Sequence, residues 1–356
     1  MTRSHSPERH YLAFAQWPAQ DRAMWAKLTE PGPTILDDRG PFADSRPRTN
    51  ATRQKNYSHW LNHITLSHSD LLPLAPAARI SQVTLTSWLV ILNRTVAPYT
   101  RLRRVVDLLT IARAMDPAAD WGLLQRAVRS LGACAAPSRN KEPRIRPSAQ
   151  LVELGFVLMR KASDMPVGRA RAATLYRDGL MIALLALRPI RLRNLTALEL
   201  GRTLLQNPAG WCITIPAEET KTHRKIEVEW PSALVAALAT YLELHRPVLL
   251  HGSVVKALWI GSSGQPLAAH TIRQAIIRRT QTALGVPINP HLFRDSAATT
   301  LAIEDPAHVG AAATILGHAS SRTTHKHYIQ ANTLIASHRH LAAVATRRQL
   351  ASKRRS

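Results

Sequence analysis

Apolar residues in this chain recur mainly at spacings of three and four, the period of an amphipathic α-helix, and this pattern constrains the fold most strongly. Between residues 56 and 132, helical segments with this pattern are separated by Pro, Asp or Gly. Alternation typical of strands occurs only at 211–216 (WCITIP) and 225–230 (KIEVEW), on either side of the turn AEETKTHR. We therefore expect a mainly α chain with a small antiparallel β-sheet.

The length of 356 residues favours two domains. The best linker is 136–148 (APSRNKEPRIRPS), which is rich in proline and basic residues and has little to bury. We expect an N-terminal extension of unknown role at 1–48, an all-α domain at 49–147 and an α+β domain at 148–356. In the last of these, helices are expected near 151–163, 171–187, 231–245, 270–285, 289–304, 306–318 and 332–350.

The excess of basic over acidic residues indicates which class of partner the chain binds. Lys and Arg number 47 against 23 Asp and Glu, a net charge of +24, and the excess is spread over both expected domains. This distribution favours a protein that surrounds a polyanion, although charge that serves solubility alone is the alternative. The only cysteines, Cys134 and Cys212, make a disulfide framework or thiolate metal cluster improbable, which suits the cytoplasm. The apolar run 179–187 is shorter than the ~20 residues of a membrane span, so no membrane is expected.

Candidate chemistry lies in four short patterns. A guanidinium follows a proline in LRPIRLRNL, a lysine lies on the turn between the expected strands, and His and Arg share a helix face in NPHLFRDSAATT. The fourth pattern, LGHASSRTTHKHYIQ, contains a histidine and, ten residues later, a tyrosine. The residues concerned are Arg191, Lys221, His291, Arg294, His318 and Tyr328.

Each pattern has a plainer interpretation when taken alone. Arg191 would cap or pair locally, Lys221 would be an ordinary charged turn residue, and Tyr328 would be a packed aromatic. A metal site is an alternative interpretation of His318, His325 and His327, but their spacing matches no familiar zinc pattern. No metal or other cofactor is therefore expected.

In this order, the four patterns resemble the tyrosine recombinase (phage integrase) family across roughly residues 170–335. The helical segment before them is similar to the core-binding domain of that family in helix pattern, basicity and position. The resemblance implies that Arg191 and Arg294 clamp a phosphate, with His291 and His318 as supporting donors. It further implies that Lys221 is the general acid and Tyr328 the nucleophile.

Three features depart from the family pattern. Asn194 stands where many relatives carry Glu, and Asp295 stands where His is frequent. The interval from His318 to Tyr328 is one residue longer than the commonest one. The two substitutions affect no residue assigned to chemistry, whereas the longer interval concerns the residues that position the tyrosine.

The resemblance implies a site-specific recombinase or integrase that cleaves and rejoins double-stranded DNA through a covalent 3′-phosphotyrosine. Such an enzyme acts without metal or ATP, as a dimer on each site and a tetramer in the synapse, with other recombinase subunits as possible partners. The resemblance also fits a bacterial, nucleoid-associated protein that belongs to a mobile genetic element and acts in integration or transposition. The expected DNA-binding residues are Arg101, Arg103, Arg104, Arg139, Lys141, Arg144, Arg146 and Arg193.

Two alternatives share the expected fold. A type IB topoisomerase would relax DNA with a similar set of residues, and a regulator would bind DNA without cutting it. The final basic helix, 332–350, has two interpretations of its own: exchange between protomers, or packing on its own domain or on DNA.

Overall fold

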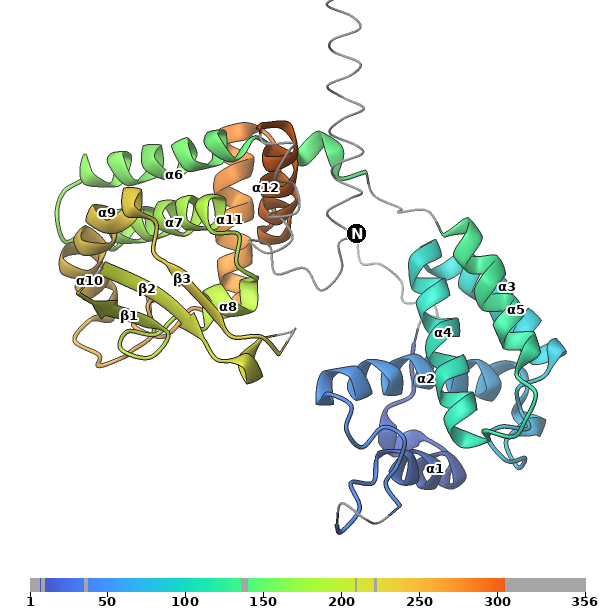
Figure 1. Cartoon of the computed structure of the whole chain (residues 1–356). Coiled ribbons are helices and arrows are strands. Elements are labelled where there is room, and N and C mark those ends of the chain that lie inside the picture. Colours follow the sequence, from blue (N-terminus) through green and yellow to red (C-terminus); the bar gives the residue numbers. More distant parts are fainter. Residues whose placement is uncertain are drawn as a thin grey trace, which may run out of the picture. The chain divides into compact units, whose positions relative to one another are not determined.

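The computed structural model describes residues 7, 10–34, 38–135, 140–208, 210–220 and 223–304. The chain forms two compact units, Met1–Asn140 and Lys141–Ser356, called here the N-terminal and C-terminal units (Figure 1). Of the linker expected at 136–148, residues 136–139 lie outside the described residues and 141–148 belong to the C-terminal unit. The fold is mostly helical with one small antiparallel sheet in the part described, which confirms the expected fold class.

The N-terminal unit is helical throughout its described part. Three of its α-helices lie close to the limits that the apolar spacing indicates, whereas α2 begins at Pro47, nine residues before the expected segment at 56. Pro47 and Pro98 occupy the first turns of α2 and α4, where a missing N–H costs nothing. The α-helices are α1 (Ala19–Thr29), α2 (Pro47–Ser67), α3 (Gln82–Thr95), α4 (Pro98–Met115) and α5 (Gly122–Cys134), with 3₁₀ turns η2 (Phe14–Gln16) and η3 (Ser69–Leu71).

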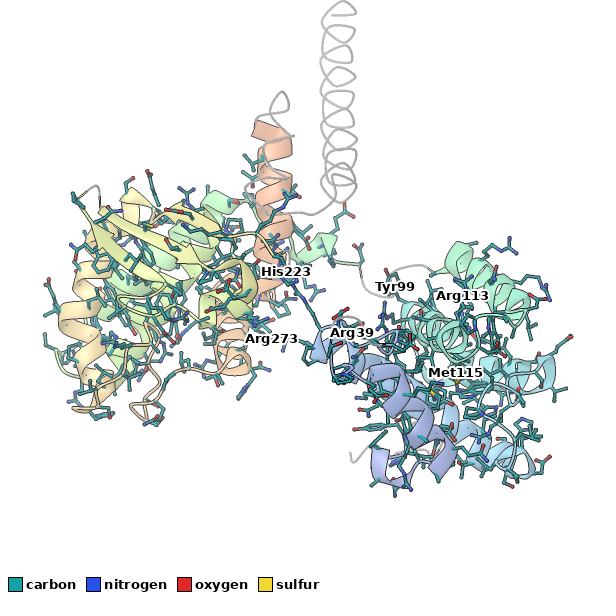
Figure 2. All side chains as sticks on the ribbon, turned by 60° about the horizontal axis from the view of Figure 1, so that its bottom comes forward. Arg39, Tyr99, Arg113, Met115, His223 and Arg273 are labelled. Atoms are coloured by element: carbon teal, nitrogen blue, oxygen red, sulfur yellow. The ribbon has the colours of Figure 1, made fainter. Side chains whose placement is uncertain are left out.

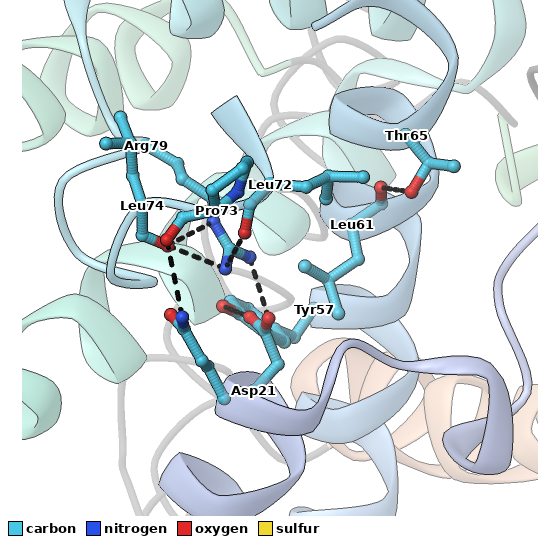
Figure 3. A network of polar contacts seen from close by, with 9 residues as sticks. Asp21, Tyr57, Leu61, Thr65, Leu72, Pro73, Leu74 and Arg79 are labelled. Carbon is cyan, nitrogen blue, oxygen red and sulfur yellow. Dashed lines mark hydrogen bonds and ion pairs between the residues drawn. The ribbon is translucent and has the colours of Figure 1, made fainter. Parts of the chain in front are cut away.

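Residues before position 48 are part of this unit's core. Trp17 and Trp25 pack edge to face with ring centroids 5.9 Å apart, and both belong to the same apolar cluster as Trp60 and Trp88 of α2 and α3. Asp21 of α1 is fully buried, where it accepts hydrogen bonds from Tyr57 (2.7 Å) and Arg79 (2.7 Å), as Figure 3 shows. The segment expected to be an extension therefore packs against the helices that follow it.

The C-terminal unit is built around α7 (Ala170–Leu187), which is buried on nearly all sides, as its apolar composition predicts. It packs on α6 (Ser148–Ser163) at unusually close range. A Cβ atom added at Gly179 would lie 2.6 Å from the carbonyl oxygen of Gly155, and one added at Gly155 would lie 2.7 Å from that of Gly179. The two glycines thus let the helix backbones touch and fix α6 against α7.

The antiparallel sheet has the order β1-β2-β3, with β1 (Leu204–Asn207), β2 (Gly210–Ile215) and β3 (Ile226–Glu229). Ile213 pairs with Leu204 on one side and Val228 on the other. The expected strands are β2 and β3. β1 is additional, because its four residues (LLQN) are too few and lack the β-branched residues that signal a strand.

Helices complete the C-terminal unit beyond the sheet. The helix expected at 231–245 is subdivided, with 3₁₀, α and π turns in succession, and the helices expected at 306–318 and 332–350 lie outside the described residues. The elements are η6 (Ser232–Leu234), α9 (Val235–Thr240), η7 (Tyr241–His245), α10 (Arg246–Leu250), α11 (Ala269–Leu284) and α12 (Pro290–Glu304).

By length and composition alone, the helical stretch Ser232–Leu250 could cross a membrane. Its apolar side chains Leu238, Tyr241 and Leu249 are instead buried in the core of the C-terminal unit, and the Tyr241 hydroxyl donates to the carbonyl oxygen of Leu258 (3.0 Å). Packing inside the folded unit accounts for these three side chains, whereas Val235 and Leu244 of the same stretch are exposed.

Candidate functional site

The Arg191 side chain leaves the chain at a tight connection between two helices. Pro189 lacks an N–H and disfavours helical geometry at Arg188, so α7 ends at Leu187. Two residues later the extended Arg191 caps α8 (Leu192–Thr196), and its carbonyl oxygen accepts from the Leu195 N–H at 2.9 Å. Since α7 is the most buried helix of the unit, this connection holds Arg191 at a rigid edge of the core.

Arg294 reaches the same connection from the first turns of α12. Its guanidinium is largely buried, and Nη1 donates a hydrogen bond of 2.6 Å to the carbonyl oxygen of Pro189. Asn289 starts the helix by accepting from the backbone N–H groups of His291 (3.0 Å) and Leu292 (3.3 Å), an ordinary N-cap. His291 and Arg294, three residues apart, therefore emerge from one turn at the positive end of α12.

Arg191, His291 and Arg294 interact electrostatically. Burial and, to a smaller extent, the nearby positive charge of Arg191 lower the pKa of Arg294 to about 10. Partial burial also lowers the pKa of His291, and so do the charges of Lys141, Arg294 and Arg191, whereas Asp295 opposes the change. The structure thus brings together the predicted residues Arg191, His291 and Arg294 in a compact cationic site, a setting suited to an anion with several oxygens.

The turn between β2 and β3 is closed by a buried threonine. Thr220 Oγ1 donates to the carbonyl oxygens of Ala217 (3.0 Å) and Arg224 (2.9 Å), and it accepts from the Arg224 N–H at 3.1 Å. Lys221, the predicted general acid, follows Thr220 directly but lies outside the described residues. His223 near the end of the turn has a left-handed backbone (φ 50°), and Figure 2 labels it together with Arg273 of α11.

The other two predicted catalytic residues, His318 and Tyr328, also lie outside the described residues, as do His325 and His327. Within the described ranges, no group of three or more His, Cys, Asp or Glu side chains is arranged to hold a metal ion.

The predicted DNA-binding residues of α4 make contacts inside the N-terminal unit. Arg103 pairs with the buried carboxylate of Asp107 at 2.9 Å, Arg101 bonds to Asn93, and Arg104 Nη2 donates to His59 Nε2 at 2.8 Å. Half of the Arg103 side chain remains exposed (51%), so its pairing leaves a face for solvent or a ligand.

The predicted residues in and after the linker divide by their contacts. Lys141 pairs with Asp295 (3.2 Å), and Arg146 donates to the carbonyl oxygens of Pro143 and Ile145 (both 2.9 Å). Arg144 lies in a 3₁₀ turn, η4 (Glu142–Arg144), Arg193 is exposed on α8, and Arg139 lies outside the described residues.

Sequence reasoning missed Asp295 as a member of the site. The carboxylate is largely buried beside Arg294, and its charge acts on both His291 and Arg294. In the sequence, Asp295 was noticeable only because it departs from the expected family pattern. Its contact with Lys141, 154 positions earlier in the sequence, forms only in the folded chain. Asn194, the other departure, is buried with its Nδ2 lacking a hydrogen-bond partner.

Comparison with known families matches residues 165–334 to the phage integrase family. The match covers a little under half of the chain and lies within the C-terminal unit. The matched range contains all six predicted catalytic residues, and its described part includes the sheet and the site formed by Arg191, His291 and Arg294.

Curated proteins similar to the chain include tyrosine recombinase XerD of Staphylococcus aureus, 31% identical over 150 residues, which are 42% of this chain and 48% of that protein. XerD of Staphylococcus saprophyticus is 29% identical over 150 residues, with the same coverage. The chain spans about half the length of these relatives.

Two solved structures of the XerH site-specific recombinase share the fold. The complex with difH substrate before cleavage has a TM-score of 0.56 at 15% identity and covers 87% of this chain and 91% of that one. The post-cleavage complex with a palindromic difH substrate has a TM-score of 0.56 at 17% identity, covering 81% of each chain. At these identities the likeness concerns the fold alone.

Proposed function

We propose that this protein is a member of the phage integrase family and acts as a site-specific recombinase that cleaves and rejoins duplex DNA through a covalent 3′-phosphotyrosine at Tyr328. The observation that carries the proposal is the convergence of Arg191, Arg294 and His291 on one edge of the core. The site also contains the Asp295 carboxylate, but its two arginines outnumber that single acid, and such an excess of positive charge suits a DNA phosphodiester.

The two guanidinium groups bind the non-bridging oxygens of the scissile phosphate and stabilise the extra negative charge of the five-coordinate transition state. Both are fixed before the reaction: Arg191 by the turn after α7, and Arg294 by its bond to Pro189 (2.6 Å). Donors that need no reorganisation contribute most to such stabilisation. His291 and His318 add further donors, so positive charge and hydrogen bonds are supplied by side chains.

Tyr328 attacks phosphorus and loses its proton, which a cationic pocket favours. The bond to the 5′ oxygen of the next nucleotide breaks, and Lys221 donates a proton to that oxygen. The phosphotyrosine retains the energy of the phosphodiester, so rejoining by a 5′ hydroxyl needs no ATP. Reversal with a hydroxyl from a second DNA site gives recombination.

Double-stranded DNA is the proposed partner, and assembly follows the family pattern of a dimer on each site and a tetramer in the synapse. The XerH relatives are described as site-specific recombinases bound to difH substrates, and XerD as a tyrosine recombinase. The net charge of +24 supports binding dominated by phosphate contacts that weaken with salt. A bacterial cytoplasmic location near the nucleoid, within a mobile element, completes the proposal.

The test uses a suicide duplex that is nicked near the crossover point, so that the short fragment diffuses away and the covalent complex accumulates. We expect the wild-type protein to form a protein–DNA adduct that survives denaturation and the Tyr328→Phe variant to form none. Equal behaviour of the two proteins would contradict the nucleophile assignment.

A plasmid with two cognate sites separates recombination from type IB topoisomerase activity. Recombinant products support the proposal, whereas relaxation without exchange supports the topoisomerase. DNA binding with neither reaction would identify a regulator.

A further inference from the structure

We propose that Lys141 is a positioning residue of the phosphate site: it holds the Asp295 carboxylate and cancels its charge, keeping the face of Arg294 and His291 open to phosphate. The inference rests on the proposed function and concerns residues within the C-terminal unit alone. It assigns to Lys141 a role different from a direct DNA contact.

Asp295 presents an electrostatic problem at this site. It follows Arg294 on α12 and lies one helical turn after His291, and its side chain is only 8% exposed. A carboxylate beside a phosphate-binding arginine competes for that arginine and repels the phosphate. Its charge already acts on the site, because it raises the pKa values of both His291 and Arg294 against the effect of burial.

Lys141 supplies the compensating charge. Its Nζ lies 3.2 Å from Asp295 Oδ2, and its own charge lowers the pKa of His291. The Lys141 side chain is 52% exposed, whereas the side chain of the carboxylate it binds is nearly covered. The pair therefore has its cation at the surface and its anion inside.

The chain around Lys141 is held against α12 at a second point. The Ser148 N–H donates to Thr300 Oγ1 at 3.1 Å, and between the two contacts the Arg144 N–H donates to the Lys141 carbonyl oxygen at 3.0 Å in η4. Residues 141–148 thus run along α12 from Asp295 to Thr300. This attachment gives Lys141 a defined position, which a lysine in a free linker would lack.

A direct DNA contact by Lys141 and the proposed action through Asp295 give different results in a double-mutant cycle. If Lys141 simply contacts a DNA phosphate, its loss will weaken binding whatever residue occupies position 295. If it acts through Asp295, removing the carboxylate as well will restore the site, because the charge that competes with phosphate for Arg294 disappears with it.

The experiment compares wild type, Lys141→Ala, Asp295→Asn and the double variant of the full chain by single-turnover cleavage of saturating suicide duplex. We expect Lys141→Ala to slow cleavage roughly tenfold, as coupling between contacting charges allows, and the double variant to recover to within about threefold of wild type. Lys141→Arg should retain most of the rate, since it preserves the charge.

Arg144→Ala is the matched control, because it removes a basic residue from the same segment. We expect Asp295→Asn to leave any effect of Arg144→Ala unchanged. A double variant Lys141→Ala/Asp295→Asn as slow as Lys141→Ala, or a Lys141→Ala rate equal to wild type, would overturn the inference. So would a loss of Tm in Lys141→Ala that accounts for the slower cleavage.

The His291 pKa, followed by NMR in the protein without DNA, tests the inference independently of activity. Lys141→Ala should raise this pKa, because the carboxylate is released toward the imidazole, and the rise should be smaller when residue 295 is Asn. An equal rise in both backgrounds would overturn the inference. If wild type forms no adduct, the proposed function fails, and this measurement alone decides the role of Lys141.

Discussion

Arg294 donates a hydrogen bond of 2.6 Å to the carbonyl oxygen of Pro189. This proline follows the end of α7 and lies two positions before Arg191. One bond therefore joins the start of α12 to the connection that carries the other arginine of the site. The position of one predicted clamp residue depends in this way on the turn that presents the other.

We expect Arg294→Lys to fail almost as completely as Arg294→Ala. A lysine lacks the planar fork that bonds Pro189 with one nitrogen and phosphate with others. Loss of a donor aimed at a developing charge costs on the order of 10²–10³ in rate. Adduct formation on suicide DNA measures the rate and a filter or shift assay measures affinity, which should fall far less because it is spread over many cations. Near-normal cleavage by Arg294→Lys would contradict the role assigned to the fork.

We expect Thr220→Val to slow cleavage of ordinary DNA and Thr220→Ser to be nearly normal. The hydroxyl closes the β2–β3 turn through Ala217 and Arg224 (2.9–3.1 Å), and Lys221 is its neighbour in the chain. A substrate with sulfur at the 5′ bridging position has a leaving group that needs no general acid. That substrate should therefore rescue both Lys221→Ala and Thr220→Val.

The matched control for the turn is Lys225→Ala, because Lys225 is half-exposed and pairs with Glu227 at 2.5 Å. Its cleavage of ordinary and sulfur-containing DNA should change by the same factor. If the sulfur substrate rescues Lys221→Ala but not Thr220→Val, the hydroxyl does not act through the lysine.

Acid is expected to destabilise the N-terminal unit between about pH 6.5 and pH 4. Burial lowers the pKa of both His59 and His63 to about 4, with the Arg104 charge contributing at His59. As pH falls through this window, the unfolded histidines take up protons while the folded ones remain neutral, so the free energy of unfolding decreases. The loss is roughly 1–3 kcal/mol for each histidine at 1.4 kcal/mol per pH unit.

Thermal unfolding of the full chain at pH 7 and pH 4.5 measures this loss. A His63→Gln variant should show a smaller drop in Tm between the two pH values than wild type. His270→Gln, which changes an exposed histidine of α11, should show the same drop as wild type. An undiminished drop in His63→Gln would mean that other groups cause the acid sensitivity.

The sequence predicted most helices and the strands β2 and β3, because their apolar spacing is local information. It also predicted Arg191, His291 and Arg294 as one site, but through the order of motifs rather than through distance. β1 was missed because its sequence, LLQN, neither alternates nor contains a β-branched residue, and the role of residues 1–48 was missed because their partners are remote. The Lys141–Asp295 and Asp21–Arg79 pairs join positions far apart in the chain, which only folding brings together.

The buried pair of Asp21 and Arg79 provides a test of whether residues before position 48 support the N-terminal unit. Both side chains are fully buried, 2.7 Å apart, and Tyr57 completes the network, its pKa raised well above the usual value by burial and by the Asp21 charge. Breaking a buried pair from one side leaves an uncompensated charge, so Asp21→Ala should lower stability by about 3–5 kcal/mol. Asp21→Ala/Arg79→Met should recover much of this loss, because the unpaired cation is removed and an apolar side chain fills its space.

Calorimetry of the full chain measures the stability of both variants, with exposed Asp70→Ala as the matched control. An equally unstable double variant would mean that the Asp21 side chain acts through Tyr57 rather than through Arg79.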